Sequence, residues 1–275
     1  MGRKVAFLGG GKMGEALVSG LIRSGGWTED EIMVTCRRGK RVNELADRYG
    51  IAATLSNPEA VEWADVLVLS VKPQDMDTLL EQIKGSVRAD QLVISFAAGI
   101  RTSFVEAACP DGTAVVRVMS NVAVLVDEAM SVIATGSSAD DEHLTMTEEL
   151  LSNVGRVMRL PEKHLDAITA TSGSGPAYFF LLAEAMIDAC ILLGLSRDVA
   201  TELIIQTMLG SAKMLRDTNK HPVILREMVT SPGGTTIEAI RELENAGIRA
   251  AFLNAISAAR DRSQELAKGA EAEDE

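Results

Sequence analysis

A glycine-rich turn near the N-terminus constrains the fold of this chain more than any other feature of its sequence. Residues 9–14 read G-x-G-x-x-G and lie directly between a short apolar run at 5–8 and an amphipathic helical pattern. In such a turn Gly9 permits a tight bend, Gly11 lets the backbone approach a pyrophosphate, and Gly14 allows the helix to pack on the strand. This context predicts a dinucleotide-binding turn; the alternative is a strand-to-helix turn that merely needs glycine.

The rest of the N-terminal part alternates short β-rich apolar runs with helical patterns. Continuous apolar strands separated by helices are typical of a parallel sheet that is covered on both faces. We therefore expect an α/β fold, with a Rossmann-type, mostly parallel sheet, over residues 1–163. Further strands are expected at residues 32–35, 66–69, 92–95, 115–118, 131–134 and 157–160.

The C-terminal part has a different character, because long helical periodicity replaces the β-branched runs from residue 164 onward. We expect an all-helical domain over residues 164–268 and a small, acidic, disordered tail over residues 269–275. Monomers rarely expose large apolar patches, so the apolar surface of these helices predicts a homodimer at least. A higher homo-oligomer and the order of the strands stay open.

Charge and ligand residues exclude several classes of protein. The 275 residues include 27 Lys and Arg against 39 Asp and Glu, a net charge of −12, and nucleic-acid affinity comes largely from clustered positive charge. No nucleic acid is therefore expected as a partner. No metal site is expected either, because the three histidines have no metal-ligand spacing to one another or to a cysteine. Three scattered cysteines and the absence of a signal-peptide core predict a cytoplasmic protein.

One apolar segment, residues 177–195, is nearly long enough to span a membrane. It contains Glu184 and Asp188 one helical turn apart, where lipid would penalise both carboxylates. We therefore interpret this segment as a core helix of a soluble protein and expect no membrane partner.

The end of the second expected strand indicates the coenzyme. An NAD-preferring site has an acidic residue there, but this chain has Arg37 and Arg38. Guanidinium groups pair with a ribose phosphate, so NADP(H) is expected over NAD(H), which stays possible. The alternative is a solvated basic helix start. Asn57 either faces the adenosine or forms a turn.

Two further strand ends complete the expected cofactor site, because ligands of open parallel sheets bind beyond the carboxyl ends of the strands. Pro73 ends one strand and fixes its loop, and Ala97 to Gly99 offer a surface of small residues for a flat ring. Lys72 either contacts ribose or phosphate or simply extends from a strand end. The expected cofactor-binding residues are Gly9, Gly11, Lys12, Met13, Gly14, Arg37, Arg38, Asn57, Ser70, Val71, Lys72, Pro73, Ala97, Ala98 and Gly99.

Two loops in the helical part share one physical logic. Residues 171–177 place Pro176 at the first position of a long helix, and residues 230–236 place Gly233 and Gly234 before another helix. Free backbone N–H groups at such positions are anion sites. The alternative is a pair of well-capped helices.

Six motifs spread over nearly the whole chain resemble the pattern of one family. They are G-x-G-x-M-G at 9–14, V-K-P-Q at 71–74, A-A-G at 97–99, S-G-S-G-P-A-Y at 172–178, G-x-A-K-M at 210–214, and the stretch from His221-Pro222 through S-P-G-G-T-T at 231–236 with Glu238. With these motifs the chain resembles the pyrroline-5-carboxylate reductase family, whose signature is the last stretch. The resemblance implies a Rossmann domain, a helical dimerisation domain, and a site shared between interleaved subunits.

The resemblance also assigns roles to residues. Thr236 would bond the substrate carboxylate or ring nitrogen and is the expected catalytic residue, while Lys72 and Ala98 would touch the cofactor. The expected substrate-binding residues are Ser174, Gly175, Pro176, Ser231, Gly233, Gly234, Thr235 and Thr236. The chain departs from the family pattern R-x-M-P-N-T-P at 117–123, where Ser120, Val122 and Ala123 stand in place of Pro, Thr and Pro.

The resemblance thus implies an NAD(P)H-dependent oxidoreductase that reduces 1-pyrroline-5-carboxylate to L-proline, the last step of proline biosynthesis. A protonated cyclic imine is already electrophilic, so the enzyme must chiefly align the reacting carbons. This agrees with a sequence that has no credible catalytic triad. The alternatives are a related imine or β-hydroxyacid reductase and a non-catalytic NADP(H)-binding regulator.

Overall fold

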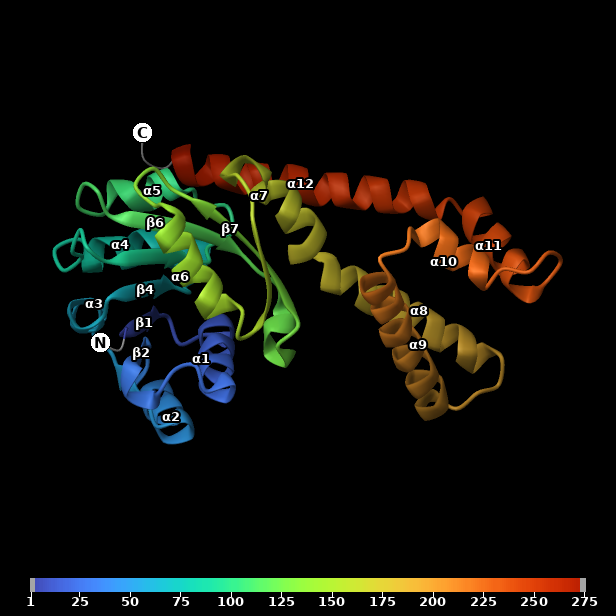
Figure 1. The fold of residues 1–275 in the computed structure, drawn as a ribbon, viewed down its shortest axis with the longest axis horizontal. Helices are drawn as coiled ribbons and strands as arrows, with labels where there is room; N and C mark the ends of the chain where they lie inside the picture. Colours follow the sequence, from blue (N-terminus) through green and yellow to red (C-terminus); the bar gives the residue numbers. More distant parts are fainter. Residues whose placement is uncertain (1–2, 273–275) are drawn as a thin grey trace. The chain divides into compact units, whose positions relative to one another are not determined.

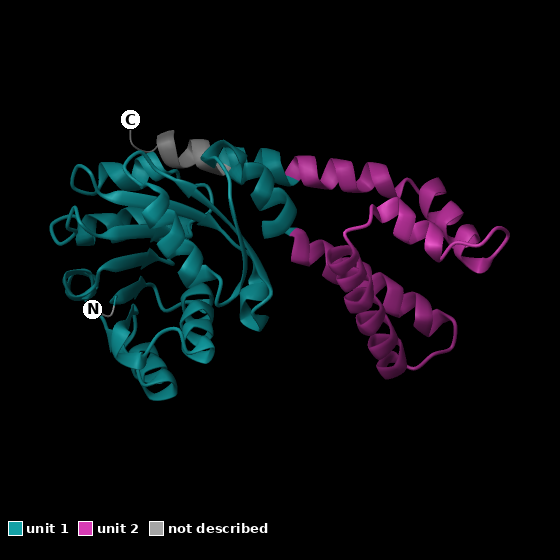
Figure 2. Ribbon diagram, in the orientation of Figure 1, with its two compact units in different colours: residues 1–174, 259–275 teal, residues 175–258 magenta. Residues whose placement is uncertain are grey.

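The computed structural model describes residues 3–272 of the chain, which divide into two compact units (Figure 2). The first unit comprises residues 1–174 and 259–275, and the second comprises residues 175–258. The chain therefore passes from the first unit to the second at Ser174 and returns at Ala259.

An eight-stranded sheet forms the centre of the first unit (Figure 1). Its strand order is β3-β2-β1-β4-β5-β6-β7-β8, with parallel pairing from β3 to β6 and an antiparallel β7 beside β6. The strands are β1 Val5–Leu8, β2 Ile32–Thr35, β3 Ala52–Thr54, β4 Val66–Leu69, β5 Leu92–Ser95, β6 Ala114–Met119, β7 Ala129–Thr135 and β8 Gly155–Arg159. The expected Rossmann-type, mostly parallel sheet is confirmed.

Helices cover both faces of this sheet, because alternate strand residues enter opposite cores. Val5 and Phe7 lie in one apolar cluster, whereas Ala6 and Leu8 lie in the other, and all four are fully buried. The first cluster receives side chains of α1 Lys12–Ser24, α2 Gly39–Tyr49 and α6 Asp141–Leu151. The second cluster receives side chains of α3 Asn57–Trp63, α4 Met76–Ile83 and α5 Thr102–Ala107.

The sequence did not predict strand β3. It has only three residues, Ala52–Thr54, none of them buried, and it lies at the edge of the sheet. A short run of small residues at an edge carries no apolar pattern, so nothing in the sequence distinguishes it from a loop.

The first unit extends beyond the expected boundary at residue 163. Helix α7 Leu165–Ile168 and the π-helical turn Thr169–Gly173 belong to it, because Leu165 packs in a buried cluster with Met119. Helix α12 Ile248–Ala272 returns to the first unit, where Ser263 Oγ donates to Asp166 Oδ1 at 2.8 Å. Residues 269–272, expected to be disordered, are the last turn of this helix, and the remaining tail residues lie outside the described ones.

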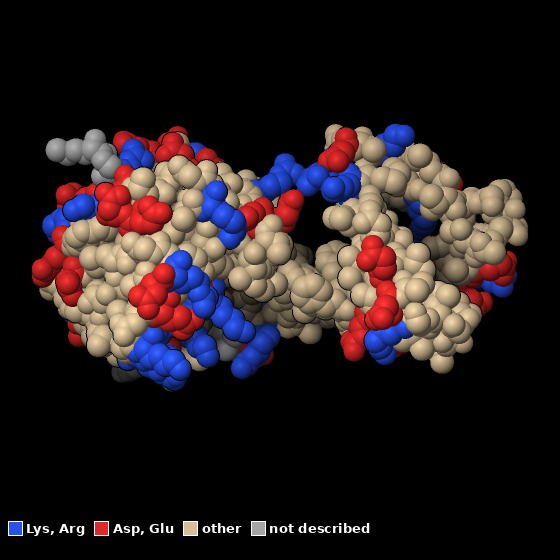
Figure 3. Space-filling view, turned by 90° about the horizontal axis from the view of Figure 1, so that it is seen from below, with Lys and Arg blue, Asp and Glu red and all other residues tan. Residues whose placement is uncertain are grey.

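The second unit is helical throughout and buries very little. Its elements are α8 Gly175–Leu192, α9 Arg197–Thr218, α10 Pro222–Met228, α11 Thr235–Asn245 and the first part of α12. Leu192 and Leu193 are 88% and 84% exposed, and Figure 3 shows that much of the visible surface of this unit carries no charge. A single copy of the unit therefore leaves a large apolar surface open.

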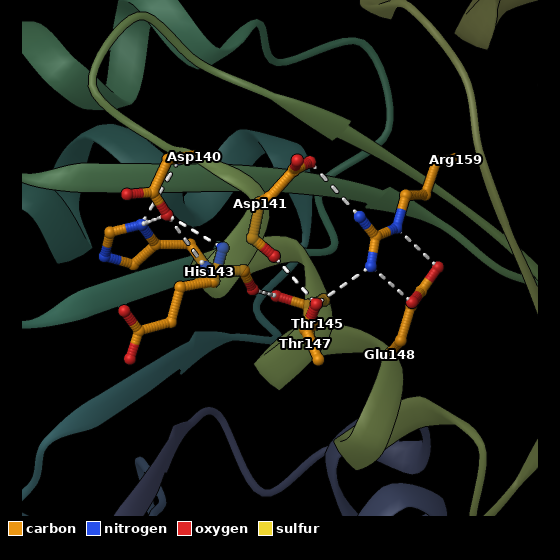
Figure 4. Close-up of polar contacts among 8 residues, drawn as sticks. Asp140, Asp141, His143, Thr145, Thr147, Glu148 and Arg159 are labelled. Atoms are coloured by element: carbon orange, nitrogen blue, oxygen red, sulfur yellow. Dashed lines mark hydrogen bonds and ion pairs between the residues drawn. The ribbon is translucent and has the colours of Figure 1, made fainter.

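Helix α6 is held at its start by a cap and at its side by an arginine (Figure 4). The Asp140 carboxylate accepts from the backbone N–H groups of Glu142 at 3.0 Å and His143 at 3.2 Å. The hydrogen bond from the His143 backbone, aided by the His143 ring, holds the pKa of Asp140 below its ordinary value. Arg159 of β8 donates to both oxygens of Glu148, at 2.8 and 2.7 Å, which lowers the pKa of that carboxyl.

We expect Asp140→Ala to lower the Tm at pH 7 by a few degrees, because two N–H groups at the helix start lose their acceptor. A lowered pKa in the folded state means that the stabilisation is present at neutral pH and is lost as the pH falls through that pKa. The difference in Tm between wild type and variant should therefore shrink in acid. Asp140→Asn keeps an acceptor and is the matched control; equal Tm values for the alanine variant and wild type at pH 7 would contradict the assignment.

Candidate active site

A cavity of about 700 Å³ lies at the carboxyl ends of strands β1, β2 and β4. Its walls come from the loops that follow these strands and from helices α2 and α4. The lining residues are Gly9, Gly10, Gly11, Thr35, Cys36, Arg37, Arg38, Lys40, Arg41, Glu44, Leu55, Asn57, Ser70, Val71, Lys72, Asp75, Thr78, Leu79 and Gln82. This is the edge of a parallel sheet at which ligands of this fold class bind.

The glycine turn has the backbone that a close approach to a ligand requires. Gly9 has φ +118°, a backbone angle that residues other than glycine rarely adopt. A Cβ atom at Gly14 would overlap the Gly9 carbonyl oxygen. A Cβ atom at Gly11, by contrast, would meet no atom within 4 Å. Packing within the protein therefore does not require a glycine at position 11. Gly11 directly precedes helix α1, whose free N–H groups favour an anion. The turn fits the pyrophosphate of a dinucleotide.

The five basic residues of the cavity fall into two groups. Arg41 is held in place: its Nε donates to the Gly10 carbonyl oxygen at 3.1 Å, and its other nitrogens pair with Glu15 and Glu44. Burial raises the pKa of Glu15, but hydrogen bonds from Arg41 and Tyr49 and the charges of Arg41 and Arg48 outweigh burial and lower it, so this carboxylate stays ionised.

The other cations remain available for a ligand. Arg37 Nη1 lies 3.1 Å from Asp75 Oδ1, but its side chain is 82% exposed. Arg38, Lys40 and Lys72 have no carboxylate partner among the described residues. No acidic residue ends β2, and the exposed cations there can attract an anionic group of a ligand.

The end of β4 adjoins the glycine turn. Ser70 Oγ donates to the Gly9 carbonyl oxygen at 2.9 Å, which joins the two strand ends. Asn57 is the first residue of α3, and its Nδ2 donates to Gln82 Oε1 at 2.7 Å within the lining of the cavity. Asn57 therefore both begins a helix and faces the cavity.

Eight of the fifteen expected cofactor residues line this cavity, and seven do not. Lys12 lines a separate cavity of about 240 Å³ with Tyr49 and Leu125. Met13 packs against the first apolar cluster, and Pro73 begins a 3-10 turn, Pro73–Asp75. The other four are Gly14, Ala97, Ala98 and Gly99.

Sequence reasoning missed several lining residues. Lys40 and Arg41 belong to the same basic run as Arg37 and Arg38, so their charge was a usable signal. Thr78, Leu79 and Gln82 on α4 carried no signal, because they are ordinary residues of an amphipathic helix. The remaining missed residues are Gly10, Thr35, Cys36, Glu44, Leu55 and Asp75.

The expected substrate residues lie at the starts of two helices. Ser174 ends the π-helical turn in the first unit, and Gly175 and Pro176 begin α8 in the second. In the other loop Gly233 has φ +68°, Gly234 precedes α11, and Thr235 and Thr236 are its first two residues. No side chain caps the start of α11, so its first N–H groups are available to an anion. Ser231 accepts from the Gly234 N–H at 3.1 Å through its carbonyl oxygen, which closes the loop.

The segment that departs from the family pattern is held by hydrogen bonds. Ser131 Oγ donates to Ser120 Oγ at 2.9 Å, and Asn121 Nδ2 donates to the Ser172 carbonyl oxygen at 3.0 Å. Asn121 also accepts from the Ala123 N–H at 3.1 Å and so caps the 3-10 turn Val122–Val126. The serine that stands in place of proline therefore has a partner of its own.

The fold and the cavity define a Rossmann-type dinucleotide-binding protein with a helical second unit. Two family models match the corresponding parts of the chain. The model described as "NADP oxidoreductase coenzyme F420-dependent" matches residues 4–99, and the model described as "Pyrroline-5-carboxylate reductase dimerisation" matches residues 162–266.

Relatives match the chain from end to end. The pyrroline-5-carboxylate reductase of Methanosarcina acetivorans is 45% identical over 97% of this chain and 98% of its own length, and that of Corynebacterium melassecola is 46% identical over 96% and 98%. The solved structure of a pyrroline-5-carboxylate reductase from Coxiella burnetii is 36% identical and superposes with a TM-score of 0.90 over 97% of this chain and 99% of its own. That of the Plasmodium falciparum enzyme with NADP bound is 28% identical, with a TM-score of 0.88 over 96% and 98%. The chain belongs to the pyrroline-5-carboxylate reductase family.

Proposed function

We propose that this chain is an NADPH-dependent enzyme that reduces 1-pyrroline-5-carboxylate to L-proline, the last step of proline biosynthesis. The observation that carries the proposal is the sequence similarity to pyrroline-5-carboxylate reductases, which extends over nearly the whole chain. The matched region includes both the residues that line the cavity and the loop before α11. The cavity of the first unit would not suffice alone, because a Rossmann fold does not determine the substrate.

The loops that follow β1, β2 and β5 would each hold one part of the nicotinamide dinucleotide. Gly9 and Gly11 would lie under the pyrophosphate, Arg37 and Arg38 would meet the ribose phosphate, and Ala97 to Gly99 would lie against the nicotinamide. When bound, the dinucleotide supplies the hydride. The absence of a carboxylate at the end of β2 supports NADP(H) over NAD(H), which remains a usable second coenzyme.

The substrate would be oriented by the start of α11. Its free N–H groups would bind the substrate carboxylate, and the Thr236 hydroxyl would donate to the carboxylate or bond the ring nitrogen. Because a protonated imine is already electrophilic, holding the imine carbon in line is the main task of these residues. No acid or base of unusual pKa is required at this site.

We propose further that the functional unit is at least a homodimer joined through the second unit, in the cytoplasm and without nucleic-acid or membrane partners. The exposed apolar side chains of α8 and α9 and the dimerisation-family match over residues 162–266 support the dimer. Residues 162–192 are helical, long and apolar enough to cross a membrane, but they lie within that match, and we assign their exposed surface to a second copy. Light scattering of the purified protein would test the dimer, and a monomer would contradict it.

The deciding experiment is NADPH oxidation with 1-pyrroline-5-carboxylate, run beside NADH at the same concentration. We expect turnover with both and a preference for NADPH. Turnover only with an open-chain keto acid would instead indicate a related reductase. Tight NADPH binding without turnover on any imine would indicate a regulator.

A further inference from the structure

A partly buried ion pair joins an inner strand of the sheet to the 3-10 turn that follows the last strand. Arg117 of β6 is 4% exposed, and its Nη1 lies 3.1 Å from Oε1 of Glu162, in the 3-10 turn Glu162–His164. The same carboxylate accepts from Thr102 twice: Oε1 from its backbone N–H at 2.9 Å, and Oε2 from its hydroxyl at 3.0 Å. Glu162 therefore links three segments that are far apart in the sequence.

Packing stability is a poor explanation for this cluster. Nε and Nη2 of Arg117 are buried and have no hydrogen-bond partner among the described residues, so the guanidinium is only partly satisfied. Buried ion pairs of this kind are often replaceable by apolar residues without loss of stability. The pair instead fixes the relative positions of the segments that it joins.

The cluster lies at both ends of the loop at residues 97–99 and binds the Thr102 end through a side chain. Ser95, which ends β5 just before the loop, is paired in register with Arg117, and Thr102, just after it, is bound by Glu162. Within the loop, Ala97 and Ile100 are buried in the second apolar cluster and the Ala97 N–H donates to Ser95 Oγ at 3.5 Å, whereas the N–H groups of Ala98 and Gly99 donate to no group within the described part of the chain. Glu162 thus adds a polar anchor at the end of a loop whose own anchors are mostly apolar.

We propose that Glu162, held by Arg117, is a positioning residue that fixes this loop and thereby the nicotinamide end of the cofactor site. The inference rests on the proposed function, in which the Ala97 to Gly99 surface aligns the nicotinamide with the imine. Glu162 acts through Thr102 and does not touch the reacting atoms. Because misalignment of reacting atoms is costly, loosening this loop slows turnover while nucleotide binding, set at the other end of the site, persists.

The test is Glu162→Ala, compared with Glu162→Gln and with the control Glu148→Ala, which removes an ion-paired carboxylate from the outer helix α6. We expect Glu162→Ala to lower kcat about tenfold, with the Kd for NADPH within about threefold of wild type. In the nucleotide-free protein, amide hydrogen exchange at residues 97–101 should be about tenfold faster, while that of α6 is unchanged. Glu162→Gln, which keeps an acceptor, should recover much of the activity, and Glu148→Ala should match wild type in both measurements.

Three outcomes would overturn the inference. One is unchanged exchange at residues 97–101, and another is wild-type kcat in Glu162→Ala. The third is faster exchange throughout the first unit together with lost NADPH binding, because that pattern belongs to a purely structural role. If Glu162→Ala does not fold, Thr102→Val removes only the hydroxyl contact and should change exchange and kcat in the same direction, by less. Absence of wild-type turnover on 1-pyrroline-5-carboxylate would instead defeat the proposed function itself.

Discussion

Replacing Arg37 and Arg38 together by alanine is expected to raise the Kd for NADPH by about 100-fold or more and to leave the Kd for NADH within about threefold. Both residues line the cavity at the end of β2, and Arg38 has no carboxylate partner among the described residues. A charge-assisted hydrogen bond to a phosphate contributes about 1.5–3 kcal/mol, so two such contacts account for an effect of this size. NADH lacks the phosphate and should not respond.

The matched control is Arg48→Ala. Arg48 lies on α2, the helix that directly follows Arg38, but pairs with Glu15 and Glu44 and does not line the cavity. Fluorescence titration with both nucleotides at two salt concentrations would give four dissociation constants for each protein. Added salt should weaken NADPH binding more in the wild type than in the double variant. An equal loss of NADPH and NADH affinity would show that the arginines shape the pocket without selecting the phosphate.

Thr236→Ala is expected to lower kcat roughly 5- to 150-fold, with the Kd for NADPH unchanged. The hydroxyl lies in the first turn of α11, which no side chain caps, and would donate one hydrogen bond to the substrate. One hydrogen bond of this kind contributes about 1–3 kcal/mol, which sets the range. Steady-state kinetics on 1-pyrroline-5-carboxylate, with a separate nucleotide titration, would measure the two effects independently.

Two neighbouring variants make this prediction specific. Thr236→Ser keeps the hydroxyl and should stay near wild type. Thr235→Ala should do so as well, because only the backbone N–H of Thr235, which the substitution keeps, is expected to contribute. Wild-type turnover in Thr236→Ala, or a loss of NADPH affinity, would remove Thr236 from its proposed role.

The first unit was largely predictable because its signals are local. Apolar runs such as Val5–Leu8 are buried on both faces of a parallel sheet, so they stand out without any partner strand in view. The glycine turn was predictable for the same reason, since a φ of +118° at Gly9 and the crowding at Gly14 are requirements of the turn itself.

Features that depend on tertiary contacts were not predictable. Residues 165–173 have the periodicity of the helical domain, but Leu165 packs against the sheet, and no local pattern distinguishes the two surroundings. Likewise, Arg38 and Arg41 belong to one basic run, yet only Arg41 finds Glu15 and Glu44 within reach. Whether an arginine is free to bind a ligand is decided by neighbours that are distant in sequence.

The return of helix α12 to the first unit has a consequence for how the chain folds during synthesis. The last strand of the sheet ends at Arg159, but the contact between Ser263 and Asp166 forms only after the whole second unit has been translated. The first unit therefore leaves the ribosome with one of its surfaces uncovered and is completed last, although it begins the chain. A truncation before Ala259 would therefore remove part of the first unit, because the second unit is an insertion within the first.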